Sequence, residues 1–440
     1  MVHKADYVVH SLTCSSNVCC FFWIFIMAKF FRTSFLSVGA LKGAITEGAL
    51  KTASPTISPV GQIFLGDKPL NPYPFWALRF WHGMPFSVWA GLVSEHSFKF
   101  SRYRLPLLVW VTLVSVFNSA AVALTNLLYG QQISRCQTRK DPIFIIGHWR
   151  SGTTLLHELM NLDQRFCCPT TYQCMAPGHF LLTERFLAPI VNRLLPNRRP
   201  MDNVLAGVDR PQEDEFALTN LGAPSPYRRL AFPATALPEP EALDLLTLTV
   251  PRRQRWCQLM HRFMRTLSVR DQRRLLLKSP THTARIAILL EMFPKARFIH
   301  VVRDPFVVFP STIRLWKSLH DTQGLQVDNG SHLEEYVFKS LEVMYRALDR
   351  DRRSVPSGSL HMVCYEDLVA DPVRALEQVY DLLDLGDFST VRPLLTAALP
   401  KFRDYCKNTY RLDARVHAEI LRRWGSIPDF KRYFEGVSSS

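Results

Sequence analysis

Four short apolar runs occur in the chain after residue 140. They occupy residues 143–146, 275–277, 298–302 and 360–364. Segments with helical periodicity separate them, for example residues 153–162 and 285–292. Strands that are apolar on both faces and alternate with helices are typical of a parallel sheet covered on both sides. The pattern therefore predicts an α/β fold in three layers, a parallel sheet flanked by helices.

Two longer apolar segments precede this α/β part. Residues 7–28 lack Lys, Arg, Asp and Glu, but their short apolar centre has the length of a signal-peptide core rather than of a membrane span. An anchor, a signal and an untranslated leader before Met27 are all open. Residues 105–134 also lack these four residue types and are long enough to span a membrane. A membrane-associated helix and a buried or surface-docked helix are both open there. Either gives the fold an N-terminal hydrophobic helical extension.

The charge balance indicates an anionic partner. The 440 residues contain 53 Lys and Arg against 38 Asp and Glu, a formal net charge of +15. Such a surplus favours a nucleotide, a sulfate or phosphate ligand, an acidic glycan, nucleic acid or an anionic lipid, without choosing among them. Hydrophobic residues make up 47% of the chain, which excludes a disordered or collagen-like protein. None of the ten cysteines forms a CxxC pair, which favours free thiols in a reducing compartment over a disulfide framework.

Cationic residues follow the apolar runs where the predicted strands end. The first run leads into the loop at residues 147–154, the second ends at Lys278 and the third at Arg303. The carboxyl ends of parallel strands lie at one edge of a sheet, and α/β proteins bind their ligands there. We therefore expect an anion to be held across this edge.

Residues 147–152 have the G-x-x-x-x-G spacing of a phosphate-binding loop between a strand and a helix. Backbone N–H groups of such a loop, and the N-terminus of the helix, point at a bound anion. A nucleoside triphosphatase carries Lys after the second Gly, where this chain has Thr153, and no predicted strand ends in an Asp placed to hold Mg²⁺. The loop indicates a P-loop-like sheet that binds nucleotide phosphates without the metal apparatus of triphosphate chemistry.

These motifs resemble those of sulfotransferases that use 3′-phosphoadenosine-5′-phosphosulfate (PAPS), in particular the bacterial-type and carbohydrate-type members. Residues 150–154 (RSGTT) are similar to the 5′-phosphosulfate loop of that family. Arg303, followed by Asp-Pro and by Ser311, is similar to the 3′-phosphate motif. Lys278 is similar to the catalytic lysine. The resemblance spans residues 141–388.

The resemblance implies a role for each position. The residues implied in binding the 5′-phosphate are Ser151, Gly152, Thr153 and Thr154, with added charge from Arg150, and those implied for the 3′-phosphate are Arg303 and Ser311. Lys278 would stabilise the charge that builds on the bridging oxygen as the sulfuryl group leaves. The acceptor is a hydroxyl or amine on a small molecule, a lipid or a carbohydrate. The product is 3′,5′-adenosine diphosphate, and the resemblance implies no metal and no nucleic acid.

The sequence leaves two candidates for the general base. Phenol-type relatives carry His two residues after the lysine, where this chain has Pro280, and the nearest histidine is His282. That residue also fits a capping or surface histidine. The other candidate is the acidic run at residues 213–215, although acids also suit the solvated first turn of a helix. We expect Glu213 to be the base and rank His282 second.

These observations divide the chain into three parts. Residues 1–50 are an apolar leader or anchor, or reflect a misassigned start. Residues 51–135 are a helical segment for which membrane association is open, and residues 136–435 are the sulfotransferase domain. We expect the protein in the cytoplasm, with or without membrane association, or at the Golgi membrane if it is eukaryotic.

An alternative function is a phosphate-loop nucleotide kinase or hydrolase, which Thr153 and the missing metal-binding Asp disfavour. Residues 252–278 carry nine cations against one acid. An apolar stripe in the same segment, from Trp256 to Leu267, predicts a helix with one buried face. The cations therefore suit a solvated helix face better than an anionic acceptor or membrane site.

Overall fold

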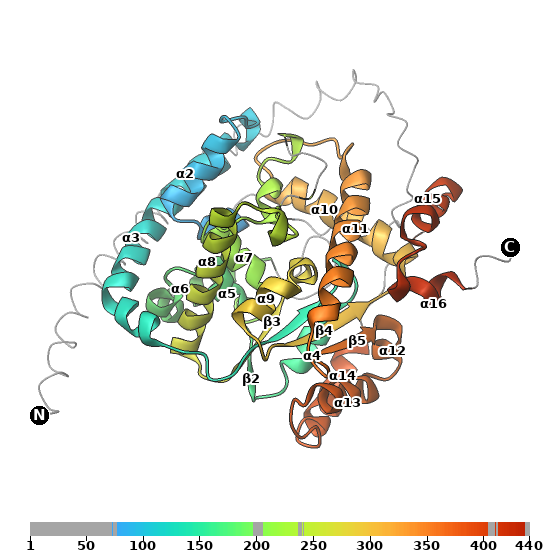
Figure 1. Cartoon of the computed structure of the whole chain (residues 1–440). Helices are drawn as coiled ribbons and strands as arrows, with labels where there is room; N and C mark the ends of the chain where they lie inside the picture. The colour runs from blue at the N-terminus through green and yellow to red at the C-terminus, as the bar shows by residue number, and fades with distance from the viewer. Residues whose placement is uncertain are drawn as a thin grey trace, which may run out of the picture. The chain divides into compact units, whose positions relative to one another are not determined.

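A parallel sheet of five strands forms the centre of the part of the chain that the computed structural model describes (Figure 1). The described residues are 77–196, 206–235, 242–403 and 412–435, together with Tyr73, Pro240 and Tyr410. The strands are β1 (Ile143–Ile146), β2 (Phe166–Cys167), β3 (Arg274–Lys278), β4 (Arg297–Val302) and β5 (Leu360–Cys364). Their order in the sheet is β2-β3-β1-β4-β5, and every pairing is parallel. The predicted leader at residues 1–50 lies outside the described residues.

Side chains of the central strand alternate between two hydrophobic clusters, one on each face of the sheet. Phe144 and Ile146 belong to the larger cluster, and Ile143 and Ile145 belong to the smaller one. Helices that contribute to the larger cluster include α8 (Val250–Arg270), α9 (Ile286–Met292), α10 (Pro305–Gln323), α11 (Leu333–Asp351), α15 (Ala414–Trp424) and α16 (Lys431–Phe434). Those of the smaller cluster are α4 (Thr153–Met160), α12 (Tyr365–Ala370), α13 (Pro372–Leu383) and α14 (Arg392–Arg403). The predicted three-layer α/β fold with a parallel sheet is confirmed.

The four apolar runs fold as strands within one residue of their predicted ends. A strand near-continuously apolar can be buried on both faces, and all four residues of β1 are fully buried. The prediction missed β2, because two residues carry no periodic pattern of their own. The apolar stripe of α8 from Trp256 to Leu267 is buried as predicted, while Arg252, Arg255 and Arg265 on the same helix are exposed.

The N-terminal hydrophobic extension packs onto the α/β part. It comprises the short 3₁₀ helices η1 (Phe80–Gly83) and η2 (Arg102–Arg104) and the helices α2 (Phe86–Glu95) and α3 (Leu105–Arg135). Trp81, Trp89 and Val111 share the larger hydrophobic cluster with Phe144 of the sheet. The described part of the segment predicted at residues 51–135 thus has no core separate from that of the sheet. By length and composition, α3 is the one described helix that could cross a membrane.

Three further helices form a chain of contacts that begins at α3, in which α6 contacts α3, α5 contacts α6 and α7 contacts α5 (Figure 1). They are α5 (Thr171–Met175), α6 (Phe180–Leu194) and α7 (Asp214–Asn220). Two 3₁₀ helices complete this region, η3 (Pro226–Leu230) and η6 (Pro280–Ala284). The acidic run singled out in the sequence therefore lies at the start of α7.

Candidate active site

Three neighbouring strands bring the predicted cations to one edge of the sheet. The central strand β1 is paired with β3 on one side, where Ile145 is in register with Lys278. On its other side β4 is in register through Ile146 and His300, and Arg303 follows directly after β4. The loop after β1 therefore lies between Lys278 and Arg303. The expected line of positive charge along the carboxyl edge is present.

The loop after β1 needs glycine at both ends of its G-x-x-x-x-G spacing for steric reasons. Gly147 has a φ of +140° and Gly152 a φ of +103°, a region that glycine adopts without strain. A Cβ on Gly147 would lie 2.4 Å from the carbonyl oxygen of Val301, and one on Gly152 would lie 2.2 Å from the Tyr365 ring. Gly152 is also the residue that precedes α4. The backbone can therefore turn tightly over the strand ends and into the helix.

The loop presents polar groups that suit a phosphate. The Ser151 hydroxyl is buried and, among the described residues, has no hydrogen-bond partner. It lies next to the N-terminus of α4, where backbone N–H groups lack helical partners and favour an anion. Burial lowers the pKa of His148 to about 4, so this loop histidine is neutral at pH 7. The residues of the loop fit a phosphate group, and the positive charge of the loop comes from Arg150.

A second polar group lies on the β4 side of the loop. The Nε of Arg150 donates to Ser311 Oγ at 2.9 Å, and Arg303 donates to the backbone oxygen of Arg150 at 3.1 Å. The Arg303 guanidinium also lies 4.2 Å from the centre of the Tyr365 ring. The sequence had grouped Arg150 with the 5′-phosphate and Ser311 with the 3′-phosphate. The Arg150 side chain therefore contacts a residue of the predicted 3′-phosphate group, so the two predicted groups adjoin.

On the β3 side, Lys278 and Glu213 form an ion pair, with 2.8 Å between Nζ and Oε1. The Lys278 side chain is 1% exposed and that of Glu213 is 14% exposed. The hydroxyl of Tyr227 donates to the other carboxylate oxygen of Glu213 at 2.5 Å. Burial and the nearby Glu213 charge raise the pKa of Tyr227 well above its ordinary value, so the phenol remains a donor. Lys278 also lies 3.5 Å from the hydroxyl of Thr154, which connects the pair to the phosphate-type loop.

Backbone pairing sets the position of Glu213. Thr170 and Pro211 form an antiparallel bridge, and the amide of Gln212 donates to the oxygen of Pro169 at 2.9 Å. Glu213 is the residue just before α7, so its side chain leaves the end of this pairing. Trp149 of the loop donates to the Tyr227 hydroxyl at 2.8 Å, which fixes the tyrosine against Glu213. The carboxylate is therefore held from both sides.

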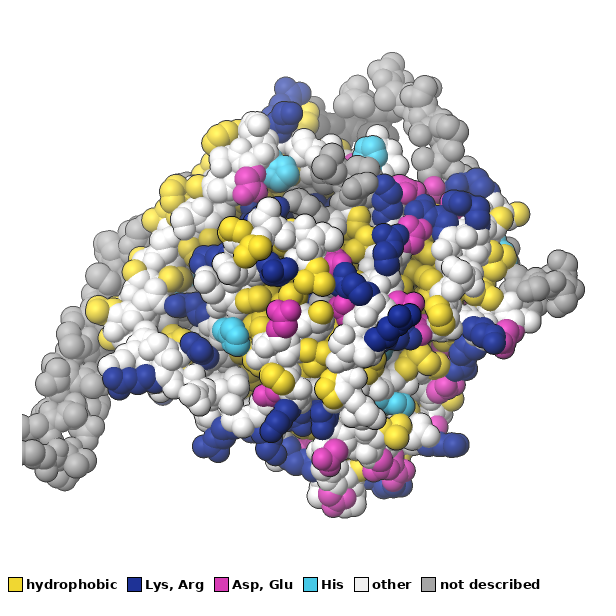
Figure 2. Space-filling model, viewed as in Figure 1, with side chains coloured by type: hydrophobic (Ala, Val, Ile, Leu, Met, Phe, Trp, Pro, Cys, Tyr) yellow, Lys and Arg dark blue, Asp and Glu magenta, His cyan; other side chains and the backbone are white. Residues whose placement is uncertain are grey.

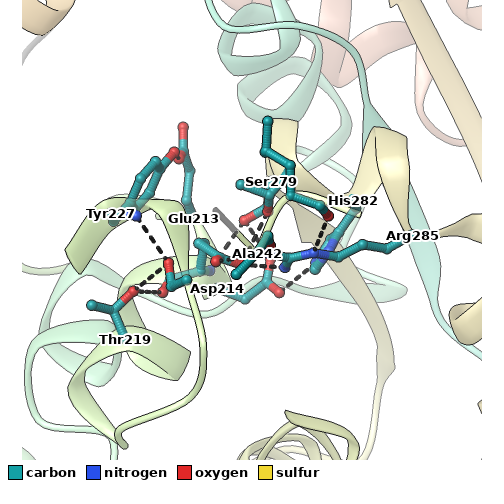
Figure 3. Close-up of polar contacts among 12 residues, drawn as sticks. Glu213, Asp214, Thr219, Tyr227, Ala242, Ser279, His282 and Arg285 are labelled. Atoms are coloured by element: carbon teal, nitrogen blue, oxygen red, sulfur yellow. Dashed lines mark hydrogen bonds and ion pairs between the residues drawn. The ribbon is translucent and has the colours of Figure 1, made fainter. Parts of the chain in front are cut away.

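The next two acids of the run are buried below Glu213 (Figure 3). Asp214 accepts from the Ser279 hydroxyl at 3.1 Å, and its other oxygen lies 2.6 Å from His282 Nε2. Glu215 accepts two hydrogen bonds from the guanidinium of Arg285, at 2.6 and 3.1 Å. Burial raises the pKa of Asp214, but the charge of His282 and its hydrogen bond outweigh burial, and the pKa is lowered overall. A solvated first turn of the helix was one expectation for this run, and for Asp214 and Glu215 it is wrong.

The two base candidates therefore occupy different environments. Glu213 is partly exposed and touches Lys278, whereas His282 is 0% exposed and holds Asp214. The surface alternative for His282 is wrong, because the ring is enclosed between Phe144 and Trp256.

The sequence did not reveal Tyr227 as the partner of Glu213, nor the two buried pairs. One signal was available for the pairs: three consecutive acids at 213–215, and Lys, His and Arg at 278, 282 and 285. Matching numbers of opposite charges next to a strand end suggest reciprocal pairing, although sequence alone cannot assign the partners.

A parallel sheet with a phosphate-type loop and a row of cations at its carboxyl edge is typical of P-loop-like group-transfer enzymes. Comparison with known proteins narrows this class. The chain belongs to the sulfotransferase family, whose sequence profile matches residues 142–389. It is 40% identical over 360 residues to the omega-hydroxy-beta-dihydromenaquinone-9 sulfotransferase Stf3 of Mycobacterium tuberculosis, and equally to that of Mycobacterium bovis. The match covers 82% of this chain and 92% of each relative.

Two solved structures share the fold. Sulfotransferase STF9 from Mycobacterium avium is 17% identical, with a TM-score of 0.52 over 80% of this chain and 96% of the other. Sulfotransferase STF1 from Mycobacterium tuberculosis is 15% identical, with a TM-score of 0.50 over 79% of this chain and 90% of the other. The predicted family and enzyme class are confirmed. The alternative of a phosphate-loop kinase or hydrolase finds no support among these relatives.

Proposed function

We propose that this sulfotransferase moves the sulfuryl group of PAPS to a hydroxyl group on a membrane lipid of the menaquinone type. The observation that carries the proposal is the contact between Lys278 and Glu213 beside the phosphate-type loop. A cation for the leaving oxygen and a carboxylate for the incoming hydroxyl are the two groups that such a transfer needs.

The donor is assigned to the two polar groups at the sheet edge. Ser151, Gly152, Thr153 and Thr154 of the loop would hold the 5′-phosphate, and Arg303 with Ser311 the 3′-phosphate. Arg150 supplies charge between them, because its backbone belongs to the loop and its side chain contacts Ser311. Charge-assisted hydrogen bonds of this kind are roughly twice as strong as neutral ones.

The transfer then proceeds in one step in which atoms and charges balance. The acceptor oxygen forms a bond to sulfur as the bond between sulfur and the 5′-phosphate oxygen breaks. Glu213 takes the proton of the acceptor hydroxyl, and Lys278 stabilises the charge on the leaving phosphate oxygen. One such electrostatic contact contributes on the order of 3 kcal/mol to the transition state. The products are a sulfate ester and 3′,5′-adenosine diphosphate.

The relatives with 40% identity support the class of acceptor. Their name specifies omega-hydroxy-beta-dihydromenaquinone-9 as the compound that is sulfated. We assign an acceptor of the same class to this chain, and we place the enzyme in the cytoplasm next to the membrane. The six described cysteines are free thiols, which agrees with a reducing compartment.

The test is a transfer assay with purified enzyme, ³⁵S-labelled PAPS and an omega-hydroxylated menaquinone in detergent micelles. We expect a labelled lipid whose mass has increased by one sulfuryl group, together with an equal amount of 3′,5′-adenosine diphosphate. The same menaquinone without its terminal hydroxyl is the matched control and should remain unlabelled. Transfer to a soluble alcohol or an amine but not to the lipid would contradict the assigned acceptor. Labelling with ³²P-ATP in place of PAPS would contradict the donor.

A further inference from the structure

Helix α3 buries mostly small or polar side chains and exposes large apolar ones. Its buried positions are Val111, Ser115, Asn118, Ala121, Thr125 and Ile133. The amide of Asn118 donates to the backbone oxygens of His82 and Met84 at 2.7 and 3.0 Å. Arg262 of α8 donates to the side chain of Asn126 at 2.5 Å. The inner face of α3 is thus fixed to the protein by the hydrogen bonds of Asn118, and exposed Asn126 is held by Arg262.

The outer face of α3 is a continuous apolar stripe. Its large side chains are between 45% and 80% exposed: Leu105, Val109, Leu113, Val116, Phe117, Leu124, Leu127 and Leu128. At 1.5 Å per residue the stripe is about 35 Å long. Figure 2 shows hydrophobic side chains along α2 and α3, at the left edge of the view. An exposed apolar patch of this size marks a surface that binds another apolar surface.

The neighbouring helix α6 extends the patch. It contacts α3, and it exposes Phe186, Ile190 and Leu194, which follow one another at intervals of four residues. Residues spaced in this way lie on one side of a helix. Two helices therefore present large apolar side chains to the surroundings.

Cations surround this apolar patch. Residues 105–134 contain no charged residue of either sign. Exposed cations lie before and after them and on α6: Arg102, Arg135, Arg139, Lys140, Arg185 and Arg193. The described acid closest in sequence on α6, Glu184, is paired with Arg270. Apolar side chains bordered by cations complement a lipid leaflet with anionic headgroups.

From this charge pattern and the exposed apolar side chains of α3 we propose that the outer face of α3 and α6 docks onto the anionic surface of a phospholipid bilayer, with α3 lying in the plane of the membrane. If α3 instead spanned the membrane, the groups that it contacts on the protein side would be carried into the hydrocarbon layer. These include Arg262 and the backbone of η1, whose polar groups would then be far from water.

The docking surface is connected to the candidate active site through η1. Asn118 of α3 holds η1, and η1 packs against α7 so closely that a Cβ on Gly83 would lie 2.5 Å from Asn220 Nδ2. Asn220 is the last residue of α7, and Glu213 is the residue just before that helix. A docked α3 therefore sets the position of the catalytic carboxylate relative to the bilayer. In this respect the inference deepens the proposed function and rests on it, since a lipid acceptor would enter from the same side.

The test is flotation of the full chain with vesicles, in the absence of PAPS and acceptor. We expect the wild type to float with vesicles of phosphatidylcholine and phosphatidylglycerol, and more weakly with phosphatidylcholine alone. The variant L124E/L128E should lose at least about tenfold in partitioning, because two leucines no longer enter the apolar layer. The variant R139Q/K140Q should lose about fivefold per cation on the anionic vesicles only. A carbonate wash should release the wild type, as expected for a helix that does not cross.

The matched control is L382E/L394E, which places the same charges at two exposed leucines of α13 and α14. It should float like the wild type. Equal flotation of L124E/L128E and wild type would overturn the proposal and place any docking elsewhere, for example in the apolar run at residues 7–28. A wild type that stays off both vesicles while forming a dimer that L124E/L128E disrupts would also overturn it, with a second copy as the occupant. Flotation is measured without turnover, so failure of the proposed transfer leaves this result unchanged.

Discussion

The three consecutive acids at 213–215 lie in two regions that differ in burial and in the partners of the carboxylates. At the sheet edge, the Glu213 carboxylate is partly exposed and is held by Lys278 and Tyr227. One and two residues later, Asp214 and Glu215 are fully buried and paired with His282 and Arg285. The Glu213 side chain is 14% exposed, whereas the side chains of Asp214, Glu215 and their partners are 0% exposed. Adjacent residues can thus have separate roles, one in catalysis and the others in the stability of the fold. The variants below test that division.

The largest expected effect is on Lys278. The variant Lys278→Met should lower kcat about 10²- to 10³-fold, because the leaving oxygen loses its stabilising cation. Calorimetry with 3′,5′-adenosine diphosphate should still detect binding, since the phosphates contact other residues. Lys295→Met, at an exposed lysine away from the site, is the control and should be neutral. Loss of nucleotide binding with an unchanged kcat at saturation would show that Lys278 serves binding only.

The second effect separates the two candidate bases. Glu213→Gln should lower kcat about 10²-fold, since the amide cannot take up the proton of the acceptor. Its unfolding temperature should fall as well, because Lys278 is 1% exposed and loses its carboxylate partner, so kcat is measured on folded protein. His282→Gln should also lower the unfolding temperature, but its kcat on folded protein should stay within a few-fold of wild type. If Glu213→Gln keeps its turnover and His282→Gln loses it, the order of the two candidates is reversed.

The third effect concerns stability rather than turnover. Glu215→Gln should lower the free energy of unfolding by about 3 kcal/mol, because Arg285 is left as a buried charge without its partner. Urea denaturation measures this loss. The double variant E215Q/R285M should recover much of it, since no lone charge then remains buried. Losses in the two single variants that simply add in the double variant would mean that the pair is not coupled.

The smallest expected effect is on how the stability of the fold changes at low pH. The folded-state pKa of Asp214 lies below its ordinary value of 3.8, so its pairing stabilises the fold at pH above that value and is lost as pH falls further. Asp214→Asn should therefore be less stable than wild type at neutral pH and should lose less stability on acidification. Denaturation midpoints measured from pH 7 down to the acid transition compare the two slopes. If the denaturation midpoints of wild type and Asp214→Asn fell in parallel with pH, Asp214 would not be the group responsible.

The local pattern of apolar residues was sufficient to predict most strands of the sheet. The runs at β1, β3 and β4 are apolar because both faces of these parallel strands are covered, and that requirement is readable residue by residue. The run at β5 was also recognised as a strand, although this edge strand is only partly buried. The two-residue strand β2 was missed, because its pairing with β3 depends on the neighbouring strand rather than on its own residues. For α3 the sequence left a membrane-associated and a docked helix open. The structure shows one face docked by hydrogen bonds and the other exposed.

The convergence of the cations at one edge of the sheet followed from the sequence because it depends on a rule of topology. Parallel strands end at one edge, so Arg150, Lys278 and Arg303 had to converge once the strands were assigned. The glycines of the loop were readable for a similar reason, since only glycine tolerates both the backbone angles and the close neighbours found there.

The partners of the acids were decided by tertiary structure alone. Glu213 reaches Lys278 across 65 residues of sequence and Asp214 reaches His282 across 68. Burial depends on the packing of α7 against η6, which no local pattern encodes. The amino-acid sequence by itself determined which charges lie along the sheet edge, because periodicity and strand ends are local properties. Only the fold decided which of three adjacent carboxylates keeps contact with solvent and which two are enclosed, because that outcome depends on segments brought together from distant parts of the chain.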